Sequence, residues 1–423
     1  MFKQMRSLTD QQGLKDSSLA HTSASFGSGR VLSLTTGVEP MSSRTERAPF
    51  KLATIVSSFL IGVKFELTLI KCYSVAPAMS TKPHDRSSLN TNSTRACVIF
   101  PGALGDVICF LPALQALLRA SQVDLYAHSE FADIVPATVT VRSLECAEIS
   151  KLFVYAGPPD SHLQNHFGAY RAIYSWLGSQ QPAFVNQLQA VSAGRAKIFP
   201  FRPAATAEHQ KEYYLRCLAL TETMRGEPAI ELRAEALRWC ENFWTENSPQ
   251  GRAVLTIAPG SGAREKNWPE EFFIAVANWW RERTGGITVL LLGPVEAARG
   301  GIDRLREHCL AVGDLRLSQA AALISRSAVY LGNDSGVSHL AAAVGVPTIA
   351  LFGPSDPRQW APRGGRVTVI SRHIHCSPCS TSIMKCCPHR ACLSELSPEE
   401  VIDVMSQLPE LASLTRWGAG ITV

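Results

Sequence analysis

Short apolar runs alternate with helical runs from residue 96 onward, and this rhythm constrains the fold more than any other feature of the sequence. The run 96–100 is followed by a helical pattern over 106–120 and by a second apolar run over 122–128. Near-continuous apolar strands between helices are typical of a parallel sheet covered by helices on both faces. The sequence therefore predicts an α/β fold. The stretch 155–225 has no strand pattern that can be assigned.

A second alternating half follows the Pro- and Gly-containing segment 247–251, which is the predicted linker. The expected strands are 254–259, 287–293, 328–333 and 348–353, and the expected helices are 269–283, 319–326 and 337–344. We therefore expect two domains, 95–246 and 247–423. Open parallel sheets bind ligands beyond the carboxyl ends of their strands, so the cleft between the domains is the expected place for chemistry.

Residues 1–94 are rich in Ser, Thr, Lys and Arg and show no sustained period, apart from one apolar run over 52–63. They are predicted to be an N-terminal extension that is largely disordered, or a mis-annotated gene start with Met79 as the true first residue. The apolar run ends at Lys64 and is shorter than the roughly 18 to 20 residues that a membrane-spanning helix needs. Basic residues precede it, so a signal-type segment is the alternative.

The composition, 46% hydrophobic and 18% charged, is that of a folded protein rather than a disordered chain. The formal net charge of +5 is compatible with an anionic substrate or an anionic membrane surface, and it is equally compatible with the absence of any such partner. Lys and Arg do not form a dense stripe interleaved with aromatic residues. Nucleic-acid binding is therefore not expected.

The segment 331–347, LGNDSGVSHLAAAVGVP, lies between two apolar runs and predicts a strand, a loop and a helix. Small residues in its loop 333–336 would let backbone N–H groups at the helix N-terminus approach a phosphate. Gly345 is expected to end the helix in a left-handed conformation, followed by Pro347. The alternative is that Asp334 and Ser335 merely cap the helix.

Two further loops follow expected strands. The loop PGSGAREKNWP, 259–269, is neither a nucleotide P-loop nor a dinucleotide fingerprint, but Lys266 could supply a charge to a diphosphate. A solvated surface lysine is the alternative. The loop PGALGD, 101–106, has Gly102 and Gly105 for close approach to a ligand. Asp106 begins the next helix, where it could be a base or a simple first-turn carboxylate.

In this order and spacing, the three loops resemble those of glycosyltransferase family 9, the ADP-heptose:lipopolysaccharide heptosyltransferases. The similarity covers about 96–408, and the tail CLSELSPEEVIDVM resembles the closing helix of the family. The resemblance implies a GT-B fold, with two Rossmann-like parallel-sheet domains facing an interdomain cleft. Domain 95–246 would be the acceptor side and domain 247–423 the nucleotide-sugar side.

The family implies an inverting transfer in which Asp106 deprotonates the acceptor hydroxyl. Lys266, with Ser335, Gly336 and Val337, would stabilise the departing diphosphate. The remaining implied donor contacts are Asp334 with sugar hydroxyls, Ser261 near the phosphates, and His339 as a residue that orients the loop.

No D-x-D sequence occurs in the chain, so the usual carboxylate clamp for a metal is absent, and we expect activity without a cofactor. Twelve cysteines are many for an intracellular enzyme, and five of them crowd near the C-terminus. Their ligand type suits zinc, and the family resemblance leaves free thiols, a disulfide or a metal clip open. The candidate structural zinc ligands are Cys376, Cys379, Cys386 and Cys392.

The expected donor is a nucleotide sugar, ADP-heptose, and the expected acceptor is a lipopolysaccharide core or another glycan or glycolipid. We expect a cytoplasmic protein, with peripheral contact to the inner membrane face as an option. The alternatives are a different donor or acceptor, a non-catalytic relative that binds nucleotide or glycan, and an interaction protein organised by zinc.

Overall fold

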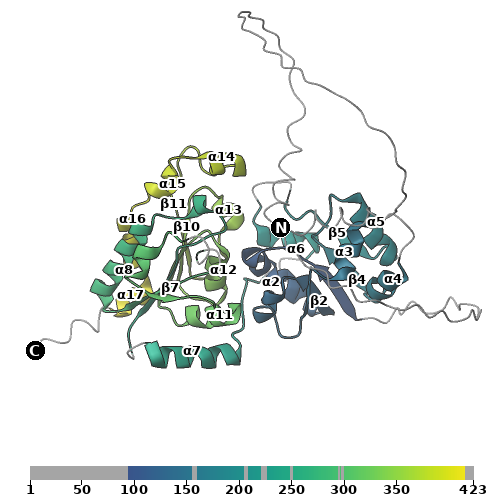
Figure 1. Ribbon diagram of the computed structural model, residues 1–423, viewed down its shortest axis with the longest axis horizontal. Helices are drawn as coiled ribbons and strands as arrows, with labels where there is room; N and C mark the ends of the chain where they lie inside the picture. Colours follow the sequence, from purple (N-terminus) through teal and green to yellow (C-terminus); the bar gives the residue numbers. More distant parts are fainter. Residues whose placement is uncertain are drawn as a thin grey trace, which may run out of the picture. The chain divides into compact units, whose positions relative to one another are not determined.

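The computed structural model describes residues 94–154, 160–203, 208–220, 226–247, 251–293, 296 and 300–414. The predicted extension lies outside the described residues apart from Thr94. Everything below concerns the described part, which forms two parallel sheets with helices packed against them (Figure 1). The α/β prediction is confirmed.

The first sheet has five strands in the order β3-β2-β1-β4-β5, and every neighbouring pair is parallel. Its strands are β1 (Arg95–Ile99), β2 (Gln122–Ala127), β3 (Thr140–Ser143), β4 (Ala172–Ser175) and β5 (Ala196–Ile198). The helical elements of this half are α2 (Leu104–Leu118), η2 (Ser129–Asp133), α3 (Ala147–Val154), α4 (Ser161–Gly168), α5 (Pro182–Val191) and α6 (Gln210–Cys217). The stretch that gave no strand pattern contains β4 and β5, which have only four and three residues.

The second sheet has six parallel strands in the order β11-β10-β9-β6-β7-β8. Its strands are β6 (Val254–Ala258), β7 (Ile287–Leu291), β8 (Leu310–Val312), β9 (Val329–Asn333), β10 (Thr348–Phe352) and β11 (Val367–Ser371). The helices of this half are α7 (Ala234–Asn247), η4 (Arg264–Lys266), α8 (Glu270–Thr284), α10 (Asp303–Arg306), α11 (Leu317–Ser325), α12 (Gly336–Ala343), α13 (Pro357–Trp360), α14 (Thr381–Cys386), α15 (Ala391–Ser394), α16 (Pro398–Ser406) and α17 (Pro409–Leu414).

Side-chain caps and a glycine define the ends of two of these helices. Helix α12 is capped by the Ser335 side chain, which accepts from Ser338 N, and it is followed by Gly345 at φ 82°. Helix α16 has a capping box between Ser397 and Glu400. The predicted left-handed stop at Gly345 is therefore confirmed.

Helix α7 lies in the predicted first domain but packs on α11 of the second half. The Cys240 thiol donates to Ala322 O at 3.4 Å. Arg233, directly before α7, contacts the first half and donates to Val135 O at 2.7 Å. The boundary between residues 246 and 247 stays a prediction.

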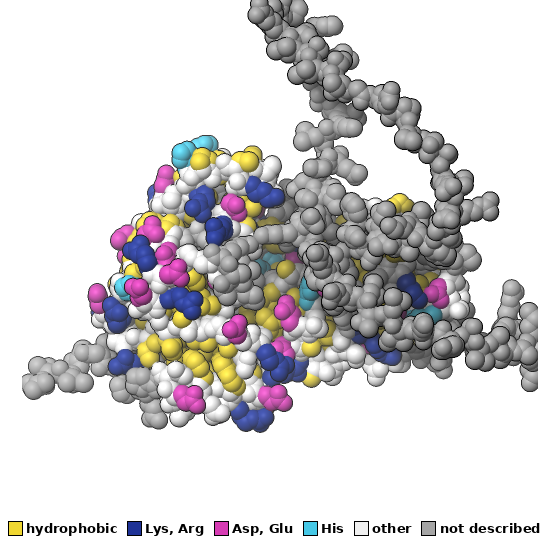
Figure 2. All heavy atoms as spheres, in the orientation of Figure 1, with side chains coloured by type: hydrophobic (Ala, Val, Ile, Leu, Met, Phe, Trp, Pro, Cys, Tyr) yellow, Lys and Arg dark blue, Asp and Glu magenta, His cyan; other side chains and the backbone are white. Residues whose placement is uncertain are grey.

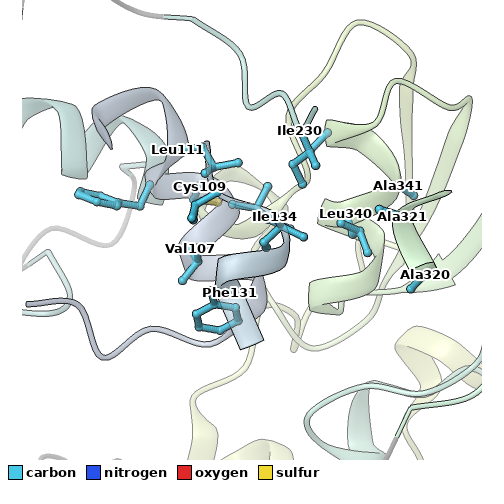
Figure 3. Close-up of a cluster of buried hydrophobic side chains, with 14 of the residues drawn as sticks. Val107, Cys109, Leu111, Phe131, Ile134, Ile230, Ala320, Ala321, Leu340 and Ala341 are labelled. Atoms are coloured by element: carbon cyan, nitrogen blue, oxygen red, sulfur yellow. The ribbon is translucent and has the colours of Figure 1, made fainter. Parts of the chain in front are cut away.

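A continuous hydrophobic cluster joins the two halves. It combines side chains of α2 and η2 with side chains of α11 and α12, and Figure 3 shows Cys109, Ile134 and Leu340 of this cluster close together. Helices α2 and α12 pack directly against each other although more than 200 residues separate them. Full burial of one large apolar side chain contributes about 1.5–3 kcal/mol, so this shared core stabilises the position of the loops that precede both helices.

Candidate active site

The three glycine-containing loops follow strands at which the strand order of a sheet reverses. In the first sheet the order reverses between β1 and β4, and the loop 100–103 follows β1. In the second sheet it reverses between β6 and β9, which are followed by the loops 259–263 and 334–335. Such switch points are where open α/β sheets form ligand crevices. The fold therefore places all three predicted loops where ligand chemistry is expected.

The loop before α2 and the loop before α12 lie against each other, and glycine is required on both sides. A Cβ on Gly336 would lie 2.8 Å from Leu104 Cβ and 3.1 Å from Gly105 N. A Cβ on Gly105 would lie 3.1 Å from His339 Cδ2. Gly102 is equally restricted, since its Cβ would lie 2.4 Å from Phe100 Cε1. These glycines allow the N-termini of two helices from different sheets to approach each other.

Asp106 is buried at the N-terminus of α2, with 5% of its surface exposed. Its Oδ2 accepts from Ala103 N at 3.1 Å, which satisfies one N–H of the first helical turn. Arg202 donates from Nη1 to Asp106 Oδ1 at 2.7 Å and from Nη2 to Oδ2 at 3.3 Å. No local sequence pattern connects Arg202 with Asp106, because 96 residues separate them.

Lys266 and Asp334 form a close ion pair. Lys266 Nζ lies 2.6 Å from Asp334 Oδ2, and the two side chains keep 27% and 9% of their surfaces exposed. The ammonium is therefore held at the second-sheet switch point and is not a freely solvated surface lysine. The pair also shows that these two predicted residues lie together.

Asn333 connects the two loops of the second sheet. Its Oδ1 accepts from Trp268 N at 3.0 Å, and its Nδ2 donates to Pro259 O at 2.6 Å. The side chain is fully buried. Asn333 was part of the predicted loop but had no role of its own in the sequence analysis.

Ser261, Ser335 and Val337 are engaged within the protein. Ser261 Oγ lies 2.6 Å from both Ala263 O and Asn267 Oδ1, so it shapes its own loop. Ser335 caps α12, as the alternative interpretation expected. The Val337 side chain packs against the hydrophobic cluster between the halves. None of these contacts tests a role in donor binding.

His339 is buried between α12 and α2, with Nδ1 3.6 Å from Cys109 Sγ. Burial lowers the pKa of this imidazole, against the opposing effects of the Asp334 and Asp106 charges. Burial likewise raises the pKa of the Cys109 thiol. A neutral imidazole and a neutral thiol fit a structural position between the two loops. The contact of Gly105 with the His339 ring places this ring beside the first turn of α2, which carries Asp106.

A cavity of about 500 Å³ opens beside the loop that carries Lys266. Its wall includes Gly260 and Asn267 of that loop, and Glu296 after β7. A Cβ on Gly260 would collide with the Glu296 carboxylate, so glycine keeps this carboxylate at the wall. Arg390 extends the wall from the cysteine-rich segment and donates to Arg264 O at 3.1 Å. The sequence analysis missed both Glu296 and Arg390.

The candidate zinc ligands do not form the predicted set. Within the described part of the chain, no three His, Cys, Asp or Glu side chains are placed to hold a metal ion. A small cavity is lined by Cys376, Cys379, Cys387 and Cys392, whereas Cys386 is exposed at the end of α14. Cys386 is not among the residues that line this cavity, and structural zinc at the four predicted cysteines stays a prediction. The cysteines in this segment are free thiols.

On the side of the second half drawn in Figure 2, Lys and Arg side chains are interspersed with Asp and Glu. None of the helices in the described ranges combines the length and apolar character that crossing a membrane requires.

The two parallel Rossmann-type sheets place the chain in the GT-B class of glycosyltransferase folds. The solved structure of a glycosyl transferase family 9 protein from Veillonella parvula superposes with a TM-score of 0.60 at 21% identity, covering 76% of this chain and 98% of that one. The structure of the ADP-heptose lipopolysaccharide heptosyltransferase II from E. coli gives a TM-score of 0.54 at 19% identity, covering 77% of this chain and all of that one. The GT-B prediction is confirmed.

Comparison of the sequence with family models identifies one family to which the chain is similar. Residues 199–387 match the model of glycosyltransferase family 9 (heptosyltransferase). Lipooligosaccharide heptosyltransferase 2 of Haemophilus influenzae is 34% identical over 128 residues, which are 28% of this chain and 36% of that protein. The chain spans about a third to a half of the length of the curated relatives that it matches. The resemblance to family 9 that the three loops predicted is thereby confirmed.

Proposed function

We propose that the protein is an inverting glycosyltransferase that transfers a heptose from ADP-heptose to a lipopolysaccharide core or a related glycan acceptor. The observation that carries the proposal is the close approach of two helix N-termini, α2 with Asp106 and α12 with the Lys266–Asp334 pair beside it. The names of the similar proteins supply the transferred heptose and the acceptor class, and the name of the E. coli heptosyltransferase structure supplies ADP-heptose as the donor. A carboxylate at the switch point of the first sheet and a cation at that of the second sheet, on loops that the packing of α2 on α12 brings together, suit a displacement at a sugar carbon.

In the proposed reaction, the Asp106 carboxylate accepts the proton of the acceptor hydroxyl. The hydroxyl oxygen bonds to the anomeric carbon as the bond from that carbon to the diphosphate oxygen breaks. The electron pair of the broken bond remains on the diphosphate. One displacement of this kind inverts the configuration at the sugar carbon.

The developing charge on the leaving group would be met by Lys266 and by the N-terminus of α12. The backbone amides of Ser335, Gly336 and Val337 lie at that N-terminus, where the helix dipole favours an anion. Preorganised donors of this kind stabilise charge that appears in the transition state. We infer that the diphosphate competes with Asp334 for Lys266, which would release the Asp334 carboxylate to bind sugar hydroxyls.

The 500 Å³ cavity beside Gly260 is the proposed position of the nucleoside. Its size lies within the range of about 300–1,000 Å³ that is usual for small-molecule sites. Ser261 would act by shaping the adjacent loop, and His339 would act by holding α12 against α2. Gly102 and Gly105 would let the loop before α2 pack closely against Phe100 and His339, which positions Asp106 on the acceptor side.

We further propose that the reaction needs no metal or other cofactor, because Lys266 and the helix dipole meet the leaving-group charge. Structural zinc in the cysteine segment is not part of the proposal. The protein would work in the cytoplasm, with peripheral contact at the inner membrane face when the acceptor is a lipid. Nucleic acid is not a proposed partner.

The test is a donor screen that measures nucleotide release with and without a lipid-linked core acceptor. We expect acceptor-dependent ADP release from ADP-heptose. Release from a different nucleotide sugar would revise the donor, and release with another glycan would revise the acceptor. Binding of ADP-heptose without release under any acceptor would indicate a non-catalytic relative and would refute the proposed activity.

A further inference from the structure

Arg202 lies where three parts of the fold meet around Asp106. Besides its two bonds to the Asp106 carboxylate, its Nη1 lies 3.2 Å from Gln210 Oε1 and 3.3 Å from the Tyr214 hydroxyl of α6. Arg202 itself follows β5, and Asp106 lies on α2. The hydrogen bonds of this guanidinium therefore hold a carboxylate in a setting built from three separate elements.

Two aromatic rings lie against the same guanidinium, one from each half of the protein. The centroid of the Phe201 ring is 4.1 Å from Arg202 Cζ, and the centroid of the Trp360 ring is 4.6 Å from it. Trp360 ends α13 of the second half. The surroundings of the Arg202–Asp106 pair thus include a side chain from the second half.

We propose that Arg202 is a positioning residue: it fixes the orientation of the Asp106 carboxylate, and the packing of Trp360 from the second half fixes Arg202. The inference rests on the proposed function of Asp106 as the base. Arg202 lies outside the three loops that the sequence predicted. Through Arg202, the orientation of the proposed base depends on contact between the two halves.

The geometry favours positioning over capture of an acidic acceptor group. A fork of two hydrogen bonds to one carboxylate defines its plane, which a single-point cation cannot do. The charge of Asp106, with contributions from Tyr214, raises the pKa of Arg202 even though burial opposes this, so the guanidinium stays charged. An arginine that served as an anion subsite would have to give up these bonds when the acceptor arrived.

Other ionisable groups surround Asp106 and also act on its charge. They are Cys109 on α2, Tyr214 on α6 and His339 on α12, and the more distant charges of Lys211 on α6 and Arg363 after α13 act on Cys109. Arg202 differs from these groups because it donates to both carboxylate oxygens. Loss of its charge is therefore expected to make the carboxylate easier to protonate.

The experiment compares Arg202→Gln and Arg202→Lys with Arg216→Gln. Arg216 is the matched control, because it also donates twice to one carboxylate, that of Glu208, and lies over the Tyr213 ring on the same helix α6. The measurements are the affinity for ADP, kcat and KM for the acceptor, the pH profile of kcat, and a ¹³C titration of the Asp106 carboxyl assigned with Asp106→Asn. Thermal unfolding reports whether each variant is folded.

We expect Arg202→Gln to lower kcat about 10- to 100-fold, as a small misplacement of a reacting group does. ADP affinity and the acceptor KM should change less than about twofold, and the Asp106 carbon should titrate roughly one to three pH units higher. The acid limb of the kcat profile should move in the same direction. Arg202→Lys should have a kcat and a carboxyl titration between those of Arg202→Gln and the native protein. Arg216→Gln should have the native values of both.

A raised acceptor KM with unchanged kcat in Arg202→Gln would assign Arg202 to acceptor binding and overturn the proposal. An unchanged carboxyl titration in the same variant would overturn it as well. If the native protein transfers no sugar, the proposed function fails, and the titration still decides whether Arg202 controls Asp106.

Discussion

Replacement of Asn333 by alanine tests whether the two loops of the second sheet act as one unit. The substitution removes the acceptor of Trp268 N–H and the donor to Pro259 O, both of which lie in the buried part of the loops. Each buried backbone group left without a partner costs about 1–3 kcal/mol, so the two together are expected to cost about 2–6 kcal/mol. This is a large part of the roughly 5–15 kcal/mol that stabilises a folded domain.

The assay is urea unfolding combined with calorimetric titration of ADP. Asn333→Ala should unfold at a lower urea concentration and bind ADP at least about tenfold more weakly, which corresponds to about 1.4 kcal/mol. The weaker binding follows because the loop with Lys266 would no longer be tied to the loop with Asp334.

Ser327→Ala is the control for this experiment. It removes one buried hydrogen bond, that between Ser327 and Thr256 at 2.6 Å, in the same half but outside the two loops. The expected cost is about 1 kcal/mol, with ADP affinity unchanged. Equal effects of both substitutions on ADP affinity, or an unchanged urea midpoint in Asn333→Ala, would refute the reasoning.

Three further predictions follow from other parts of the structure. Lys266→Met should weaken ADP binding by about 1–3 kcal/mol, measured by the same titration, because it removes a charged hydrogen-bond donor; unchanged affinity would contradict the role of the ammonium. Burial lowers the pKa of His209 to about 4, so the folded state resists its protonation and stability should be about 2 kcal/mol lower at pH 5 than at pH 7. His209→Gln should reduce that difference in urea unfolding, and an unaltered difference would assign the pH dependence to other groups. Transfer activity should survive a chelator such as EDTA, and an absolute Mg²⁺ requirement would contradict the metal-free mechanism.

The sequence predicted the parts of the fold that carry strong periodicity. The strands β1, β6, β9 and β10 are almost wholly buried, so each appears as an uninterrupted apolar run. The short strands β4 and β5 were missed because three or four residues cannot establish a pattern. Their positions in the sheet depend on pairing with distant β1, which a local pattern does not encode.

The candidate site was predictable where its residues lie in glycine-containing loops and unpredictable where they do not. Asp106, Lys266 and Asp334 follow strands at positions that local sequence can identify. Arg202 and Trp360 reach the site by tertiary packing from segments without a distinctive motif. The lining of the small cavity by Cys387 and not by Cys386 was unpredictable for a related reason, since spacing alone cannot tell which of two adjacent thiols faces a cavity.

The central claim is that Asp106 acts on the acceptor and not on donor binding. The most direct measurement compares Asp106→Asn with the native protein in two quantities, the ADP-heptose dissociation constant and the rate of acceptor-dependent ADP release. We expect an unchanged dissociation constant and a rate lower by about 10²–10⁴-fold, the usual contribution of a general base. A variant that releases ADP at the native rate would contradict it.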